Sequence, residues 1–171
     1  MTDTSIPTIE NLIQVCRDAE DGFAAAAEAA TDPELKQALG EYAQQRMQFA
    51  RDLRDEGAVF GNQEPAEGGM PGSPARRAWL KVRDPLGTLD DHTILDECER
   101  AEDAAVEAYH AALETPGLAG CLRGTVAAQF SEVLGMHRRI REWRERFVPA
   151  GSRGWRFRAE LATADDLRHV S

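Results

Sequence analysis

Apolar residues recur at intervals of three and four through four long stretches of the chain, which predicts four amphipathic helices. The first two patterns span about residues 8–30 and 33–56, and the other two span about residues 90–114 and 118–147. Each pattern gathers its apolar residues on one stripe, and such a stripe has to be buried against other helices. The sequence therefore predicts an all-α fold.

Short breaks separate the first helix from the second and the third from the fourth. Thr31-Asp32-Pro33 supplies an N-cap aspartate and a proline for the first helical position, and Thr115-Pro116-Gly117 forms the other break. Helices joined by such short connections pack as antiparallel hairpins. A long link, rich in Gly and Pro and with a short helical pattern near residues 75–82, joins the two hairpins. Two hairpins joined by one long crossover predict a ferritin-like four-helix bundle.

The whole of this pattern fits one domain followed by a tail. We expect the bundle domain to span residues 1–148, and residues 149–171 to form a C-terminal tail that contains arginine and tryptophan. A chain of 171 residues is long enough to bury one ordinary core. Aromatic residues make up only 6% of the chain, which favours helices that meet through small side chains.

One six-residue motif occurs twice, as CRDAED from residue 16 and as CERAED from residue 98. It lies on the first helix of each predicted hairpin, so it indicates an internal repeat. Glu20 and Glu102 each follow the motif's cysteine by four residues and therefore fall on the apolar stripes, where we interpret Cys16 and Cys98 as core residues. A carboxylate on a core face is costly unless it is paired, hydrogen-bonded or bound to a metal.

The partner helices carry polar residues at the same level of the bundle. In di-iron carboxylate bundles, two helices give one Glu each and the other two give Glu-x-x-His. Here the second pair of helices reads Gln-x-x-Gln from residue 45 and Gln-x-x-Glu from residue 129, so both histidines are missing. The candidate metal ligands are Glu20, Gln45, Gln48, Glu102, Gln129 and Glu132.

Two interpretations of this level of the bundle stay open. In the first, Glu20, Gln45, Glu102 and Gln129 form a buried hydrogen-bonded layer that sets the register of the helices, with Arg46 as a counter-charge if it turns inward. In the second, the carboxylates and amide oxygens bind a divalent metal ion, for which Mn²⁺, Mg²⁺ or Ca²⁺ suits the oxygen ligands. The missing histidines weaken the case for Fe²⁺ and for oxygen or peroxide chemistry.

Four stretches of the chain carry a family resemblance: TIENLIQVCRDAEDGF, DPELKQALGEYAQQRMQFARDL, ILDECERAEDAAVEAY and EVLGMHRRI. With these stretches, over about residues 8–145, the chain resembles a bacterial family of uncharacterised ferritin-like four-helix-bundle proteins, a domain of unknown function. The resemblance implies a layout similar to that of di-iron proteins and no activity that carries over. A link to stress or metal handling rests on this analogy alone.

The charge of the chain bears on its partners. The net charge is −10, so the chain repels nucleic acid and anionic membranes except where its arginines are grouped. Eight arginines and two tryptophans lie between residues 138 and 158. Such a segment can bind phosphate and stack bases, but arginines at a helix end that pair with acidic residues of the same or another subunit are the stronger interpretation. We expect a homo-oligomer, a dimer, and no nucleic-acid binding.

Several classes of protein lack support in the sequence. The three cysteines show no C-x-x-C spacing, which argues against a disulfide scaffold or a zinc ribbon. No signal peptide or membrane-spanning run is apparent, so we expect a cytoplasmic protein. Without a nucleophile elbow or a phosphate-binding loop, hydrolase and nucleotide chemistry have no basis, and no small-molecule substrate is indicated. The open functions are a metal-binding bundle without assigned activity and a non-enzymatic structural or interaction protein.

Overall fold

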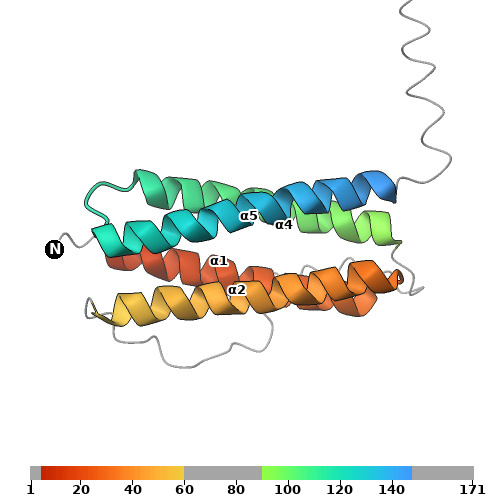
Figure 1. Cartoon of the computed structure of the whole chain (residues 1–171), viewed down its shortest axis with the longest axis horizontal. Coiled ribbons are helices and arrows are strands. Elements are labelled where there is room, and N and C mark those ends of the chain that lie inside the picture. Colours follow the sequence, from red (N-terminus) through yellow and green to blue (C-terminus); the bar gives the residue numbers. More distant parts are fainter. Residues whose placement is uncertain (1–4, 60–89, 148–171) are drawn as a thin grey trace, which may run out of the picture.

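Four long helices form two antiparallel hairpins in the computed structural model, which describes residues 5–59 and 90–147 (Figure 1). The all-α prediction and the prediction of a four-helix bundle built from two hairpins are both confirmed. The apolar periodicity locates each helix to within a few residues. The helices are α1 (Ser5–Ala29), α2 (Pro33–Val59), α4 (Asp91–Glu114) and α5 (Gly120–Arg146).

Some predictions fall outside the described residues. The link between the hairpins, with its short helical pattern near residues 75–82, is one of them, and the tail of residues 149–171 is the other. The course of the predicted crossover and the division of the chain at residue 148 therefore stay predictions.

The α4–α5 hairpin lies against the α1–α2 hairpin, with the long axes of all four helices roughly aligned (Figure 1). Helix α1 packs on α2 and α4, and α5 packs on α4 and α2. The helices α2 and α4 thus stand diagonally across the bundle axis. A side chain on one of them meets a side chain on the other only at the centre of the core.

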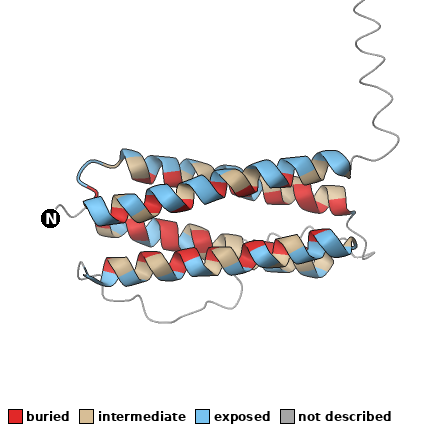
Figure 2. Ribbon diagram, viewed as in Figure 1, coloured by how far each residue is buried: buried red, intermediate tan, exposed pale blue. Residues whose placement is uncertain are grey.

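Each helix buries one stripe and exposes the opposite side (Figure 2). This is the amphipathic pattern that the sequence predicts, and burying these stripes is the main stabilising contribution to the fold. Among the described helices, none is both long and apolar enough to cross a membrane.

Hydrogen bonds at one end of the bundle join the two hairpins directly. Asp91, at the start of α4, is buried and accepts hydrogen bonds from the Thr31 amide at 2.8 Å, the Thr31 hydroxyl at 2.7 Å and the Asp32 amide at 3.0 Å. Asp32 in turn caps α2 by accepting from the Leu35 amide, as predicted. The turn of the first hairpin is therefore fixed to the first residue of the second.

The opposite end of the bundle has its own connection between the hairpins. Ser5 is buried there, and its hydroxyl donates to the carbonyl of Gly117 in the α4–α5 turn at 3.4 Å. Gly117 has a φ of 81°, a left-handed conformation that glycine adopts without steric cost. Arg123 donates to the carbonyl groups of Leu113 and Thr115 and so satisfies the C-terminal end of α4.

The apolar core divides into two clusters along the bundle. One cluster combines the first half of α1, the second half of α2, the C-terminal part of α4 and the first half of α5. The other cluster combines the remaining half of each helix. Buried polar side chains lie where these clusters meet. We call this set the central polar layer, and it consists of Cys16, Arg46, Glu102, Tyr109 and Gln129.

Candidate functional site

An ion pair between Arg46 and Glu102 crosses the centre of the bundle. Arg46 lies on α2, four residues after Tyr42 and three before Phe49, so helical spacing puts it on the buried stripe. Glu102 lies on α4, four residues after Cys98, and is buried for the same reason. The Nη2 of Arg46 donates to Oε2 of Glu102, and both side chains are 0% exposed.

The surroundings of the Arg46 guanidinium are largely apolar. Its Nη2 lies 3.7 Å from the sulfur of Met136, and its central carbon lies 5.8 Å from the centre of the Phe49 ring. Within the described part of the chain, Nε and Nη1 of Arg46 and Oε1 of Glu102 are buried without a hydrogen-bond partner. One hydrogen bond thus joins the two side chains, and three other polar atoms of the same two side chains are buried in the core without such a bond to any described residue.

Burial and charge act in opposite directions on Glu102. Removal from water raises the pKa of its carboxyl group, while the positive charge of Arg46 and its hydrogen bond lower that pKa. Such a pair is costly to split, because whichever charge remains is left buried and uncompensated.

The other members of the central polar layer form a chain of hydrogen bonds. The hydroxyl of Tyr109 on α4 donates to Oε1 of Gln129 on α5 at 2.9 Å, and Nε2 of Gln129 donates to the carbonyl of Phe49 on α2 at 3.2 Å. Cys16 on α1 lies 3.1 Å from the Tyr109 hydroxyl. Because that hydroxyl gives its one proton to Gln129, the Cys16 thiol is the donor to Tyr109.

This chain holds neutral groups. Burial raises the pKa of the Cys16 thiol, and burial also raises the pKa of the Tyr109 hydroxyl far above its ordinary value. Neither group is therefore a thiolate or phenolate near neutral pH. Together with the ion pair, which lies about two helical turns away from Tyr109 along α4, the chain connects all four helices in the middle part of the bundle.

Two of the six predicted site residues, Glu102 and Gln129, are buried as predicted. They do not bind one another, since Glu102 pairs with Arg46 and Gln129 pairs with Tyr109. Of the two interpretations, the buried polar layer is therefore present, but with membership different from the predicted one.

The other four predicted residues lie away from the centre. Glu20 is half-buried, so the prediction that it is buried on the stripe is wrong, although partial burial still raises the pKa of its carboxyl. Gln45 donates from Nε2 to Oε2 of Glu132 at 3.3 Å near the surface, and exposed Gln48 donates to Asp52 at 2.8 Å. Gln45 is displaced because its neighbour Arg46 takes the central position on α2.

Metal binding by these residues stays a prediction. Within residues 5–59 and 90–147, no three or more His, Cys, Asp and Glu side chains converge in an arrangement that could hold a metal ion. The carboxylate that reaches the centre, Glu102, already contacts a cation, the guanidinium of Arg46.

Two arginines in the described part of the arginine-rich segment pair with acidic residues of the same chain. Arg141 lies 3.2 Å from Glu99, and Arg144 contacts both Glu99 and Asp96. Arg146 lies over the ring of Trp143, with 4.5 Å between its guanidinium carbon and the ring centre. Intrachain pairing, one of the predicted roles of these arginines, is confirmed for Arg141 and Arg144, and the segment after residue 147 lies outside the described residues.

Sequence reasoning missed Asp91 and the hydrogen bonds of Tyr109. Asp91 follows another aspartate at the start of a helix, so the sequence suggests only that one of the two caps the helix. Its contact with the α1–α2 turn arises only in the tertiary fold. Tyr109 falls on the apolar stripe of α4 and reads as core, yet its hydroxyl needs a partner there. The inward spacing of Gln129 was the available signal for that partner.

The sequence also matches a known family model. The model described as Domain of unknown function (DUF2383) matches residues 4–115, which include α1, α2 and α4 and therefore Arg46, Glu102 and Tyr109. No curated protein matches the sequence. Because the match covers more than half of the chain, the protein belongs to the DUF2383 family.

Proposed function

We propose that this protein is a ferritin-like bundle whose central cation is Arg46 in place of a metal ion, and that it acts by self-association through the outer face of α4 and α5. The proposal thus favours a structural or interaction protein over a metal-dependent one. The arrangement of two hairpins supports the ferritin-like assignment.

The geometry at the centre supports the exchange of a metal ion for a guanidinium. Ferritin-like metal sites collect carboxylates from several helices around the ions. Here Glu102 compensates Arg46, while Glu20 lies away from the pair and half-buried. A divalent ion at Glu102 would have to bind beside a buried positive charge, and the repulsion between them is strong in a core of low dielectric constant.

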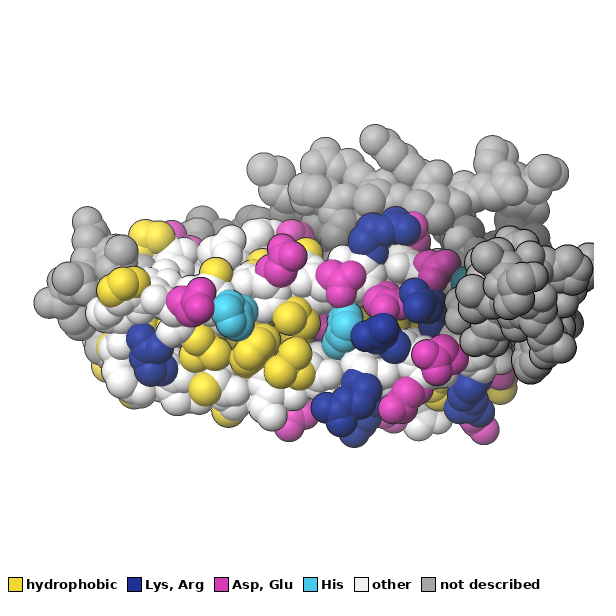
Figure 3. Space-filling model, turned by 90° about the horizontal axis from the view of Figure 1, so that it is seen from above, with side chains coloured by type: hydrophobic (Ala, Val, Ile, Leu, Met, Phe, Trp, Pro, Cys, Tyr) yellow, Lys and Arg dark blue, Asp and Glu magenta, His cyan; other side chains and the backbone are white. Residues whose placement is uncertain are grey.

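The observation that carries the functional proposal is an apolar strip on the outer face of α4 and α5. Leu134 is exposed at 39% and lies four residues after Phe130 and three before His137, so these side chains share one face of α5. Ala127 extends the strip by one turn, and His110 of α4 packs edge-on against Phe130 at 6.3 Å. Figure 3 shows apolar side chains gathered between two histidines on this face.

Charged side chains lie beyond the strip along the same face. Near one end His137 pairs with Asp103 at 2.7 Å, and Arg141 pairs with Glu99 further along. An apolar centre with a polar margin is the usual composition of a protein–protein interface. A two-fold dimer brings this one strip against its own copy, which requires only that the strip be self-complementary.

The test is the molar mass of the full chain in solution, measured by light scattering after size-exclusion chromatography. We expect a dimer, and we expect Leu134→Glu to give a folded monomer because it places a carboxylate at the centre of the strip. The matched control is Ala24→Glu, which adds the same charge at an exposed position of α1 and should remain a dimer. A monomeric wild-type protein, or equal behaviour of the two variants, would overturn the proposal.

A further inference from the structure

A crevice between α1 and α4 opens from the surface toward the centre of the bundle. Small residues create it: Ala19 and Gly22 on α1 and Ala101 on α4 leave the two helices without side chains to fill the gap. Phe23 and Cys98 supply apolar walls. The cavity itself has a volume of about 30 Å³, enough for one or two water-sized groups, so only one small group of a ligand enters it while the rest stays at the open mouth.

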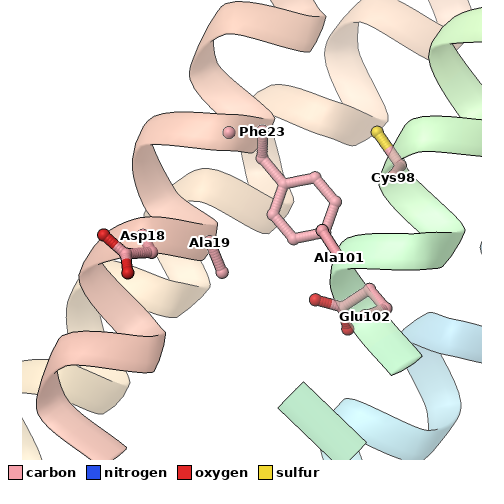
Figure 4. Close-up of a pocket in the computed structure, with 7 residues that line it drawn as sticks. Asp18, Ala19, Phe23, Cys98, Ala101 and Glu102 are labelled. Carbon is pink, nitrogen blue, oxygen red and sulfur yellow. The ribbon is translucent and has the colours of Figure 1, made fainter. Parts of the chain in front are cut away.

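The inner end of the crevice is the carboxylate of Glu102. One of its oxygens, Oε2, binds Arg46, while Oε1 has no hydrogen-bond partner among the described residues although the side chain is 0% exposed. Figure 4 shows this carboxylate directed from α4 into the space in front of Phe23, whereas Asp18, at the mouth, turns its carboxylate away. A buried acceptor without a partner favours any ligand that brings a donor to it.

The charges at this end decide which donor fits. Arg46 already compensates Glu102, so an ammonium group or a metal ion would place a second positive charge beside the guanidinium. An anionic group would be repelled by the negative charge of the Glu102 carboxylate, whose free oxygen faces the crevice. A neutral hydroxyl group can donate to Oε1 without either repulsion, and the ring of Phe23 offers an apolar surface to the rest of the ligand.

We infer that the α1–α4 crevice is a binding site for a small, neutral, largely apolar molecule that carries one hydroxyl group, which donates to Oε1 of Glu102 while the apolar body packs on Phe23. This site goes beyond self-association and lies on a different face of the bundle. A failure of one proposal therefore leaves the other in place.

The experiment is an NMR titration of the isotope-labelled full chain with three probes of one shape: benzyl alcohol, toluene and benzylamine. We expect benzyl alcohol to bind about fivefold more tightly than toluene, which corresponds to one net hydrogen bond. Benzylamine, protonated at neutral pH, should bind more weakly than the alcohol. The shifts should be confined to the residues that line the crevice.

Two variants locate the site and its polar contact. Ala101→Phe fills the crevice and should abolish binding, whereas Ala104→Phe, at an exposed α4 position that does not line it, should leave binding unchanged. In Glu102→Gln the amide oxygen faces Arg46 and the NH₂ group faces the crevice, so the preference for the alcohol over toluene should be lost. If Glu102→Gln does not fold, the Ala101→Phe comparison still decides.

Three results would overturn the proposal. The first is the absence of titratable shifts with any probe up to its solubility limit, which would mean that the crevice holds water only. The second is equal binding of toluene and benzyl alcohol by the wild-type chain. The third is unchanged binding by Ala101→Phe, which would place the probes elsewhere on the bundle.

Discussion

Arg46 and Glu102 each lie on the buried stripe of their helix, and their neighbours on that stripe are apolar. Their burial has a large desolvation cost, which the attraction between them offsets only while both are present. The effect of a buried polar residue on the stability of this bundle therefore depends on whether its partner is present. The same holds for Tyr109, whose hydroxyl satisfies Gln129 on a neighbouring helix.

A double-mutant cycle measures this dependence. We expect Arg46→Met and Glu102→Leu each to lower the free energy of unfolding by about 3–5 kcal/mol, since each leaves one buried charge unpaired. The double variant should recover most of that loss, because apolar side chains of similar size replace both charges. Urea unfolding of the four proteins gives the values, and a double variant as unstable as the sum of the single losses would contradict the account.

Spacing could place Glu102 and Gln129 inward but could not choose between Gln45 and Arg46. Consecutive residues on a helix differ by about 100° in direction, and a buried stripe is at least that wide, so both positions fit the α2 pattern. Which of the two reaches the centre depends on how the helices are rotated in the assembled bundle. Glu20 was misplaced for the same reason, since it lies at the edge of the α1 stripe.

The helices themselves were predictable because each repeats its apolar pattern over many turns. The ends of the helices were less predictable, because contacts between the hairpins influence where each helix begins and ends. Helix α1 begins at Ser5 instead of near residue 8. At this start the Ser5 hydroxyl donates to the carbonyl of Gly117 in the other hairpin. Helix α2 continues to Val59, beyond its predicted end near residue 56, and Gly57 within this extension is buried.

The contact of Asp91 with the α1–α2 turn predicts a large effect for one residue at a helix end. We expect Asp91→Ala to lower the free energy of unfolding by about 2–3 kcal/mol, because three donors of Thr31 and Asp32 lose their charged acceptor. Asp55→Ala, at an exposed position of α2, is the matched control and should change stability little. Equal effects in thermal or urea unfolding would show that Asp91 is an ordinary surface aspartate.

Asp90, the N-cap of α4, predicts a pH-dependent contribution. Hydrogen bonds from Thr93 lower the pKa of its carboxyl below the ordinary 3.8, so ionised Asp90 favours the folded state. That contribution is complete above the ordinary pKa and is lost as the pH falls through the lowered one. Urea unfolding should show wild type more stable than Asp90→Asn at pH 6, with the difference shrinking as the pH falls below the ordinary pKa of 3.8.

The control for that prediction is Glu107→Gln, which removes a charge from an exposed position in the middle of α4. Its difference from wild type should be small at both pH values. A wild-type advantage over Asp90→Asn that grows as the pH falls would contradict the direction of the pKa shift.

At the scale of the whole molecule, the pairing of helices followed from connection lengths alone, since short breaks leave no choice but antiparallel hairpins. The way in which the two hairpins meet did not follow. Their meeting puts α2 and α4 on a diagonal and so allows the contact between Arg46 and Glu102. Which side chains contact one another at the centre of a bundle depends on how its hairpins pack, and the apolar pattern of a single helix does not specify that packing.

The central claim is that the cation at the middle of this bundle is Arg46, and metal content tests it most directly. The full chain, purified without chelator, should contain far less than one metal ion per chain by mass spectrometry. Its melting temperature should not change on adding Mn²⁺ or Fe²⁺. Arg46→Ala is the informative companion, because metal that binds only after the guanidinium is removed agrees with the claim. One or two metal ions per wild-type chain, lost in Glu102→Gln, would contradict it.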